Sequence, residues 1–135
     1  MATSFISIYL VIPFLNKNKH EDLIQLKDIL EDTNLLFIPS RAECYGIVFN
    51  EASAFGIPSL STKTGGIPEV VIGGLNGFSL PLDATSSMYT ESIKNLIQNE
   101  KLYYQLSIKA RNKYLTENNW LHFGKSIRNL IESIS

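Results

Sequence analysis

The segment from residue 35 to residue 56, LLFIPSRAECYGIVFNEASAFG, constrains the fold most, because a strand, a loop and a helix follow one another in it. Its first four residues are apolar and predict a buried parallel strand, which Pro39 ends by removing a backbone donor. Apolar residues then recur at helical spacing, at Val48, Ala52 and Phe55. We therefore predict a helix that begins near Gly46 or Ile47 and ends at a left-handed cap on Gly56.

Two carboxylates, Glu43 and Glu51, flank the start of this helix with seven residues between them. A first helical turn has free backbone N–H groups and the positive end of the helix dipole, so an anion site is predicted at Gly46, Ile47 and Val48. Glu51 lies about 6–8 Å further along the axis, at a rise of ~1.5 Å per residue. This separation suits a diphosphate at the helix start and a ribose diol at Glu51, while Glu43 faces the opposite end of the ligand. Glutamates at this spacing are common on helices, so the prediction depends on their context, which is the carboxyl end of a strand.

A second strand and a glycine loop follow. Residues 57–61 predict a short strand, and Gly65 and Gly66 allow either close approach of the backbone to a ligand or a turn with positive φ. Pro68 suits the first turn of a short helix, and residues 78–80 predict a last strand. The alternation predicts the α/β class, as part of a Rossmann-like domain with a parallel sheet. No G-x-G-x-x-G follows a strand and no P-loop motif occurs, which disfavours dinucleotide oxidoreductases and P-loop phosphotransferases.

Elements are also predicted at both ends of the chain. Phe5–Leu15 predicts a strand, since it is too short to span a bilayer and has no basic residue before it. Asn18 and Glu21 predict a capping box for a helix that ends near Glu31. Its inner face is predicted to carry Leu23, Leu26 and Leu30.

Three helices are predicted in the C-terminal part. Asp83 is predicted to cap the first, from Ala84 to about Gln98, and the others begin at Lys101 and after Trp120. The stripes predicted to face a core are Met88, Leu96 and Ile97 on the first helix, Leu102, Leu106, Ala110 and Tyr114 on the second, and Phe123, Ile127, Leu130, Ile131 and Ile134 on the third. The basic cluster Lys109, Arg111 and Lys113 is predicted to lie on a solvated face.

Composition and charge limit the kinds of partner that this chain is expected to bind. The chain has 135 residues, 44% of them hydrophobic and 19% charged, which fits one globular domain. A net charge of −1 gives no basic field for nucleic acid. The single cysteine, Cys44, excludes an internal disulfide, and we expect a small half-buried residue there rather than a nucleophile.

Three motifs in order, EcygivfnE, AsFGIPsLST and GGIPEVV, resemble those of the group 1, GT4-type retaining glycosyltransferases. The resemblance runs from about Val11 to the C-terminus. It implies the GT-B arrangement of two Rossmann-like domains, of which this chain is similar to the later part of the C-terminal, nucleotide-sugar-binding domain.

By this resemblance, the parent enzyme transfers a sugar from a nucleotide diphosphate to an acceptor hydroxyl. Glu43 would be the catalytic residue at the donor sugar, and Glu51 would contact the ribose. Gly46, Ile47 and Val48 would hold the diphosphate, and Gly65 and Gly66 would line the nucleotide side. No cofactor and no bound metal are implied. The last helix would cross to the acceptor domain.

We expect residues 1–135 to be a single, partial domain that is inactive alone and self-associates through an exposed strand edge or the C-terminal helix. Its partners would be a nucleotide sugar and an acceptor, whether a sugar, a lipid or another hydroxyl compound, in a cytoplasmic location with or without peripheral attachment to a membrane. Two alternatives stay open. One is a non-catalytic nucleotide- or partner-binding module, and the other is another GT-B-type enzyme such as a nucleotide-sugar epimerase.

Overall fold

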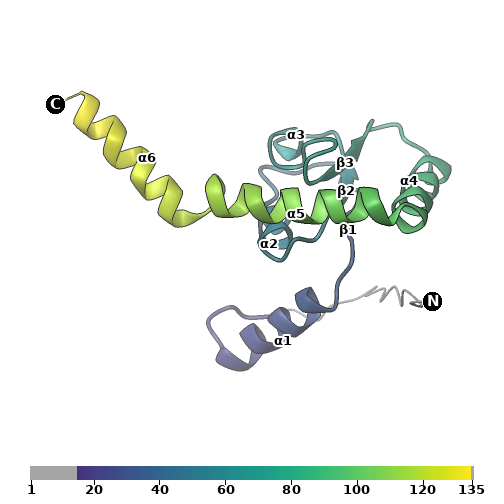
Figure 1. Cartoon of the computed structure of the whole chain (residues 1–135), viewed down its shortest axis with the longest axis horizontal. Coiled ribbons are helices and arrows are strands. Elements are labelled where there is room, and N and C mark those ends of the chain that lie inside the picture. Colours follow the sequence, from purple (N-terminus) through teal and green to yellow (C-terminus); the bar gives the residue numbers. More distant parts are fainter. Residues whose placement is uncertain (1–14, 135) are drawn as a thin grey trace.

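A three-stranded parallel sheet lies at the centre of the structure, a computed structural model that describes residues 15–134 (Figure 1). The strands β1 (Leu36–Ile38), β2 (Ser59–Thr62) and β3 (Gly77–Leu80) are neighbours in chain order, with Leu60 of β2 opposite both Phe37 and Phe78. The helices α2 (Ile47–Ala54) and α3 (Ile67–Val70) connect them. The predicted α/β class and parallel sheet are confirmed. The strand predicted at Phe5–Leu15 lies almost entirely outside the described residues.

The core forms where α2 and α3 cover the sheet. Phe49, Ile67, Val70 and Val71 are buried together. The predicted α2 is confirmed, with Gly56 in the left-handed region at φ 69° beyond its end. Its buried face was predicted in part: Ala52 is buried and Val48 packs against the core, but Phe55 is 41% exposed, and Phe49 and Ser53 are buried as well. The cause is the short helix, which ends before Phe55.

The C-terminal helices are α4 (Ser86–Gln98), α5 (Glu100–Thr116) and α6 (Trp120–Ser133). Figure 1 shows α5 running along the body of the protein and α6 extending beyond it. Leu106 and Ala110 of α5 are buried, as predicted. Asp83 is not a cap, because α4 begins after Thr85, and of its predicted inner residues Leu96 is buried while Met88 and Ile97 are exposed. No residue of α6 is buried, so its predicted stripe is not core.

The helix α1 (His20–Glu31) lies apart from the sheet (Figure 1). Its N-cap is Lys19 without a side-chain cap, so the predicted capping box from Asn18 is wrong. Asn16 instead links the preceding turn to the helix, since its Oδ1 accepts from Asn18 N and its backbone N–H donates to Oδ2 of Asp22. No residue of α1 is fully buried, and the predicted inner residue Leu23 is 44% exposed.

The basic cluster on α5 contacts neighbouring elements rather than only solvent. Lys109 and Arg111 donate to the backbone carbonyls of Gly74 and Ala54. Lys113 pairs with Glu117, with 3.2 Å between Nζ and Oε2. Lys109 and Arg111 therefore help to hold α5 against the loop before β3 and the end of α2.

Candidate functional site

The acidic loop after β1 and the glycine loop after β2 interlock at the carboxyl edge of the sheet. The N–H of Gly66 donates to the carbonyl of Cys44 over 3.0 Å, and the Thr64 hydroxyl donates to the carbonyl of Arg41 over 3.2 Å. Gly65 has φ +51°, and a Cβ there would lie 1.7 Å from the carbonyl oxygen of Glu43. The two glycines thus allow one loop to approach the other, which brings two predicted parts of the site together.

The start of α2 has no side-chain cap. Gly46 is its N-cap, in the left-handed region at φ 76°, and no side chain caps the helix. The first-turn N–H groups of Ile47 and Val48 therefore have no side-chain acceptor, which is the arrangement that favours a bound anion. A Cβ at Gly46 would lie 2.6 Å from the ring of Phe49, so glycine is required for this geometry.

The two predicted carboxylates lie on different sides of this helix start. Glu43 is half-buried, and its Oε1 accepts from the N–H of Cys44 over 3.0 Å. Cys44 is exposed rather than half-buried, so that prediction is wrong. Glu51 lies further along α2 and forms an ion pair with Lys17.

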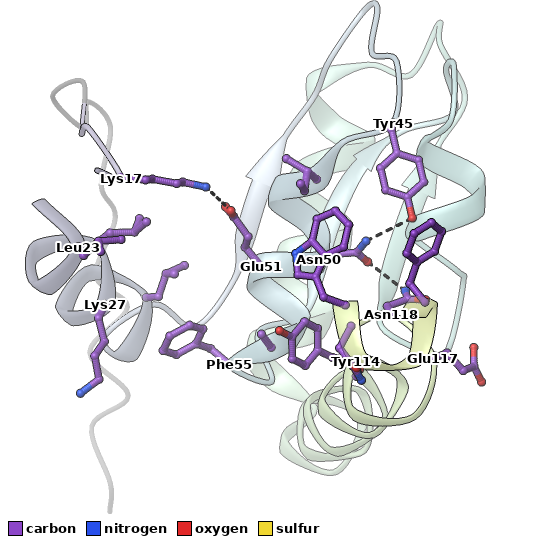
Figure 2. Close-up of a pocket in the computed structure, with 17 residues that line it drawn as sticks. Lys17, Leu23, Lys27, Tyr45, Asn50, Glu51, Phe55, Tyr114, Glu117 and Asn118 are labelled. Atoms are coloured by element: carbon purple, nitrogen blue, oxygen red, sulfur yellow. Dashed lines mark hydrogen bonds and ion pairs between the residues drawn. The ribbon is translucent and has the colours of Figure 1, made fainter. Parts of the chain in front are cut away.

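A pocket of about 760 Å³ opens beside Glu51, between α1 and the wall formed by α2 and the α5–α6 junction (Figure 2). Glu51 and Ile47 line this pocket, whereas Glu43, Gly65 and Gly66 do not. Its apolar side chains are Leu23, Leu26, Leu30, Ile47, Ala54, Phe55, Trp120 and Phe123. The pocket can therefore accept a largely apolar or aromatic group with polar contacts at the Glu51 end.

A chain of amides and a phenol closes one side of the pocket (Figure 2). Asn118, at the α5–α6 junction, donates to Asn50 over 3.0 Å, and Asn50 donates to the Tyr45 hydroxyl over 3.3 Å. The sequence analysis did not identify Lys17, Asn50 or Asn118. Their contacts join residues 34 and 68 positions apart, and no local pattern reports such pairs.

The comparisons with known proteins identify the family to which this chain belongs. The family model of the group 1 glycosyl transferases matches residues 11–113, and the chain belongs to that family. A curated relative, N-acetyl-alpha-D-glucosaminyl L-malate synthase of Bacillus anthracis, is 32% identical over 62% of this chain and 22% of its own. This chain thus spans under a quarter of that relative's length.

Two solved structures share the fold. Sucrose-phosphate synthase from Thermosynechococcus elongatus aligns over 81% of this chain and 28% of its own, with a TM-score of 0.67 and 24% identity. HepE from Anabaena, in complex with UDP, aligns over 84% of this chain and 35% of its own, with a TM-score of 0.69 and 19% identity. The three-stranded sheet and its helices are thus part of a GT-B-type fold. Within residues 15–134, no helix is long and apolar enough to cross a bilayer.

Proposed function

We propose that residues 1–135 form a single, partial nucleotide-sugar-binding domain of a retaining, GT4-type glycosyltransferase. The observation that carries the proposal is the arrangement along α2, where an uncapped helix start lies between Glu43 in the acidic loop and Glu51 in the pocket. Membership of the group 1 glycosyl transferases supports it, as do the UDP and UDP-glucose named with the HepE structures.

In this proposal each part of the site has a different task. The N–H groups of Gly46, Ile47 and Val48 stabilise the diphosphate as negative charge develops on it, which is the leaving-group stabilisation that a sugar transfer needs. Glu51 accepts hydrogen bonds from the ribose hydroxyls. Glu43 contacts hydroxyls of the donor sugar as the catalytic carboxylate. Gly65 and Gly66 hold the acidic loop in place beside the nucleotide.

Calorimetric titration of the whole chain with UDP, GDP, ADP and their sugar conjugates tests this proposal. We expect saturable binding of at least one nucleoside diphosphate and a loss of about ten-fold or more in affinity in Glu51→Gln, because a charged acceptor is removed from the diol. Glu91→Gln, on the exposed side of α4, is the matched control and should bind as the wild type does. Equal binding by all three proteins would exclude Glu51 from the site.

The role of Glu43 is tested in a protein that also contains the acceptor part. There, Glu43→Gln should lower turnover with little change in nucleotide affinity, whereas Glu51→Gln should weaken nucleotide binding. Independence from metal ions and other cofactors is also part of the proposal, and it predicts that EDTA leaves the titrations unchanged. The acceptor would be a hydroxyl compound, either a sugar or a lipid.

We also propose that the chain works in the cytoplasm and self-associates through α6. The apolar face of α6 is unburied, and its polar face carries charges of both signs at Lys125, Arg128 and Glu132. With a net charge of −1 on the whole chain, two copies experience little mutual repulsion. A second copy of the same helix is the proposed occupant of this face.

A further inference from the structure

One ion pair joins the two walls of the pocket. Lys17, in the turn before α1, bonds to Oε1 of Glu51 on α2, and Figure 2 shows the two side chains meeting between α1 and α2. About half of the Lys17 side chain (53%) is exposed, as is 32% of that of Glu51. The carboxylate proposed to hold the ribose therefore already has a charged partner.

The other charged residues that line the pocket are paired within one helix or at its end. Lys27 pairs with Glu31 of α1 at 3.4 Å, and Glu117 pairs with Lys113 of α5 at 3.2 Å. Among the ion pairs described within residues 15–134, Lys17–Glu51 thus differs in that it joins two separate elements that line the pocket.

The turn that carries Lys17 is held firmly on α1. The carbonyl of Asn16 accepts from Lys19 N over 2.8 Å, its Oδ1 accepts from Asn18 N over 3.0 Å, and its own N–H donates to Asp22 over 2.7 Å. The backbone of Lys17 is fixed by these contacts, and its four-carbon side chain is free to redirect the ammonium group.

We propose that Lys17 is a binding residue for the anionic part of the ligand, and that its ammonium moves from Glu51 to the diphosphate when a ribose diol takes its place. This inference rests on the proposed function. Glu51 is the fifth residue of α2, so it lies about 6 Å from the helix start at ~1.5 Å per residue. That distance is within the length of an extended lysine side chain, and a compact ammonium is a strong partner for phosphate oxygens.

The exchange makes opposite predictions for charged and uncharged ligands. A nucleoside has a diol but no phosphate, so it must displace Lys17 without offering it a new partner. A nucleoside diphosphate offers Lys17 a new partner in its phosphate oxygens. Removing the ammonium should therefore lower the affinity for the diphosphate, while the affinity for the nucleoside stays unchanged or rises slightly. If Lys17 only held Glu51 in position, its removal would lower the affinity for both ligands alike.

The test compares Lys17→Met with the wild type and with Lys94→Met, a matched control that removes the same charge from the exposed side of α4, outside the pocket. UDP is titrated by calorimetry, and uridine by NMR chemical-shift changes, which report weak binding; GDP or ADP with its nucleoside replaces them if that base is preferred. In Lys17→Met we expect about ten-fold or more loss of diphosphate affinity, a smaller dependence of that affinity on salt, and no loss for the nucleoside. Lys94→Met should bind both ligands as the wild type does, and Lys17→Arg should keep most of the diphosphate affinity.

The outcomes separate this inference from the proposed function. If Glu51→Gln abolishes binding while Lys17→Met binds the diphosphate as the wild type does, the role of Lys17 is wrong and the donor site stands. If Lys17→Met loses affinity for the nucleoside and the diphosphate to the same extent, the exchange is also wrong. Such a result indicates that the ion pair with Lys17 only holds Glu51 in position. If the wild type binds none of the three nucleoside diphosphates, both proposals fall.

Discussion

At the scale of single residues, Gly65 and Gly74 share a left-handed backbone but differ in surroundings. Their φ angles are +51° and +74°, yet a Cβ at Gly65 would lie 1.7 Å from the carbonyl oxygen of Glu43 while a Cβ at Gly74 would have nothing within 4 Å. Both alanine variants lose stability because alanine disfavours a left-handed backbone. Only Gly65→Ala must also push the glycine loop away from the acidic loop. We expect Gly65→Ala to be about 1–3 kcal/mol less stable than Gly74→Ala, measured by urea denaturation.

The same pair of variants tests the loop contact as part of the site. Gly65→Ala should also lower affinity for the nucleoside diphosphate, because the acidic loop moves with Glu43, whereas Gly74→Ala should not. Equal stability and equal binding in the two variants would mean that the glycine loop does not set the position of the acidic loop.

A second prediction at this scale concerns Tyr103 on α5. Burial raises the pKa of Tyr103 above its ordinary value of 10.0, and the neighbouring Tyr104 raises this pKa further. The folded state therefore holds this proton more tightly than the unfolded state does. The associated stability is complete below pH 10.0 and is lost as the pH rises through the folded-state pKa. Tyr103→Phe should reduce the fall of unfolding free energy in this range, measured by urea denaturation at a series of pH values.

Tyr104→Phe is the control for that prediction. It removes the smaller cause of the shift and leaves the burial of Tyr103, so most of the pH dependence should remain. A slope that is identical in wild type and Tyr103→Phe would contradict the assignment.

At the scale of helices, two asparagine caps should have different consequences for the whole protein. Asn99 accepts from Leu102 N over 3.0 Å at the start of α5, and Asn119 accepts from His122 N over 2.9 Å at the start of α6. Since α5 packs against α2 through Leu106 and Ala110, Asn99→Ala should lower the global unfolding free energy by about 0.5–2 kcal/mol. No residue of α6 is buried, so Asn119→Ala should reduce helical circular dichroism and speed amide exchange in α6 with little change in the global midpoint. Equal global losses would show that α6 folds together with the body.

The helices and strands also show which features could be predicted from local sequence patterns. The strand at Leu36–Ile38, the start of α2 and the cap at Gly56 were predicted because each depends on neighbouring residues. Two N-termini were assigned to the wrong residue, since several polar residues near each helix start are candidates for the cap: Lys19 rather than Asn18 precedes α1, and Thr85 rather than Asp83 precedes α4. Within the candidate site, Glu43 and the glycines could be identified by motif. Their mutual contact, and the pair between Glu51 and Lys17, depend on tertiary packing that spacing does not encode.

At the scale of the whole molecule, two kinds of surface have no cover from the residues that the structure describes: strand edges and an apolar helix face. Within residues 15–134, β1 and β3 each pair only with β2. The helix α6 exposes a stripe of large side chains, from 42% of Ile127 to 78% of Ile134. Unsatisfied strand edges and contiguous apolar helix faces are both surfaces through which protein chains associate.

The stripe on α6 leads to a prediction about the state of the protein in solution. Sedimentation velocity of the whole chain should show association that increases with protein concentration. The double variant Ile127→Ser with Leu130→Ser should shift the distribution to the monomer, because it replaces the centre of the apolar face. Leu121→Ser is the matched control. Leu121 is 70% exposed, but at 100° per residue it projects among the polar residues of α6, so the variant should associate as the wild type does. A wild type that stays monomeric at all concentrations would contradict association through α6, and a double variant that still associates would move the contact to the strand edges.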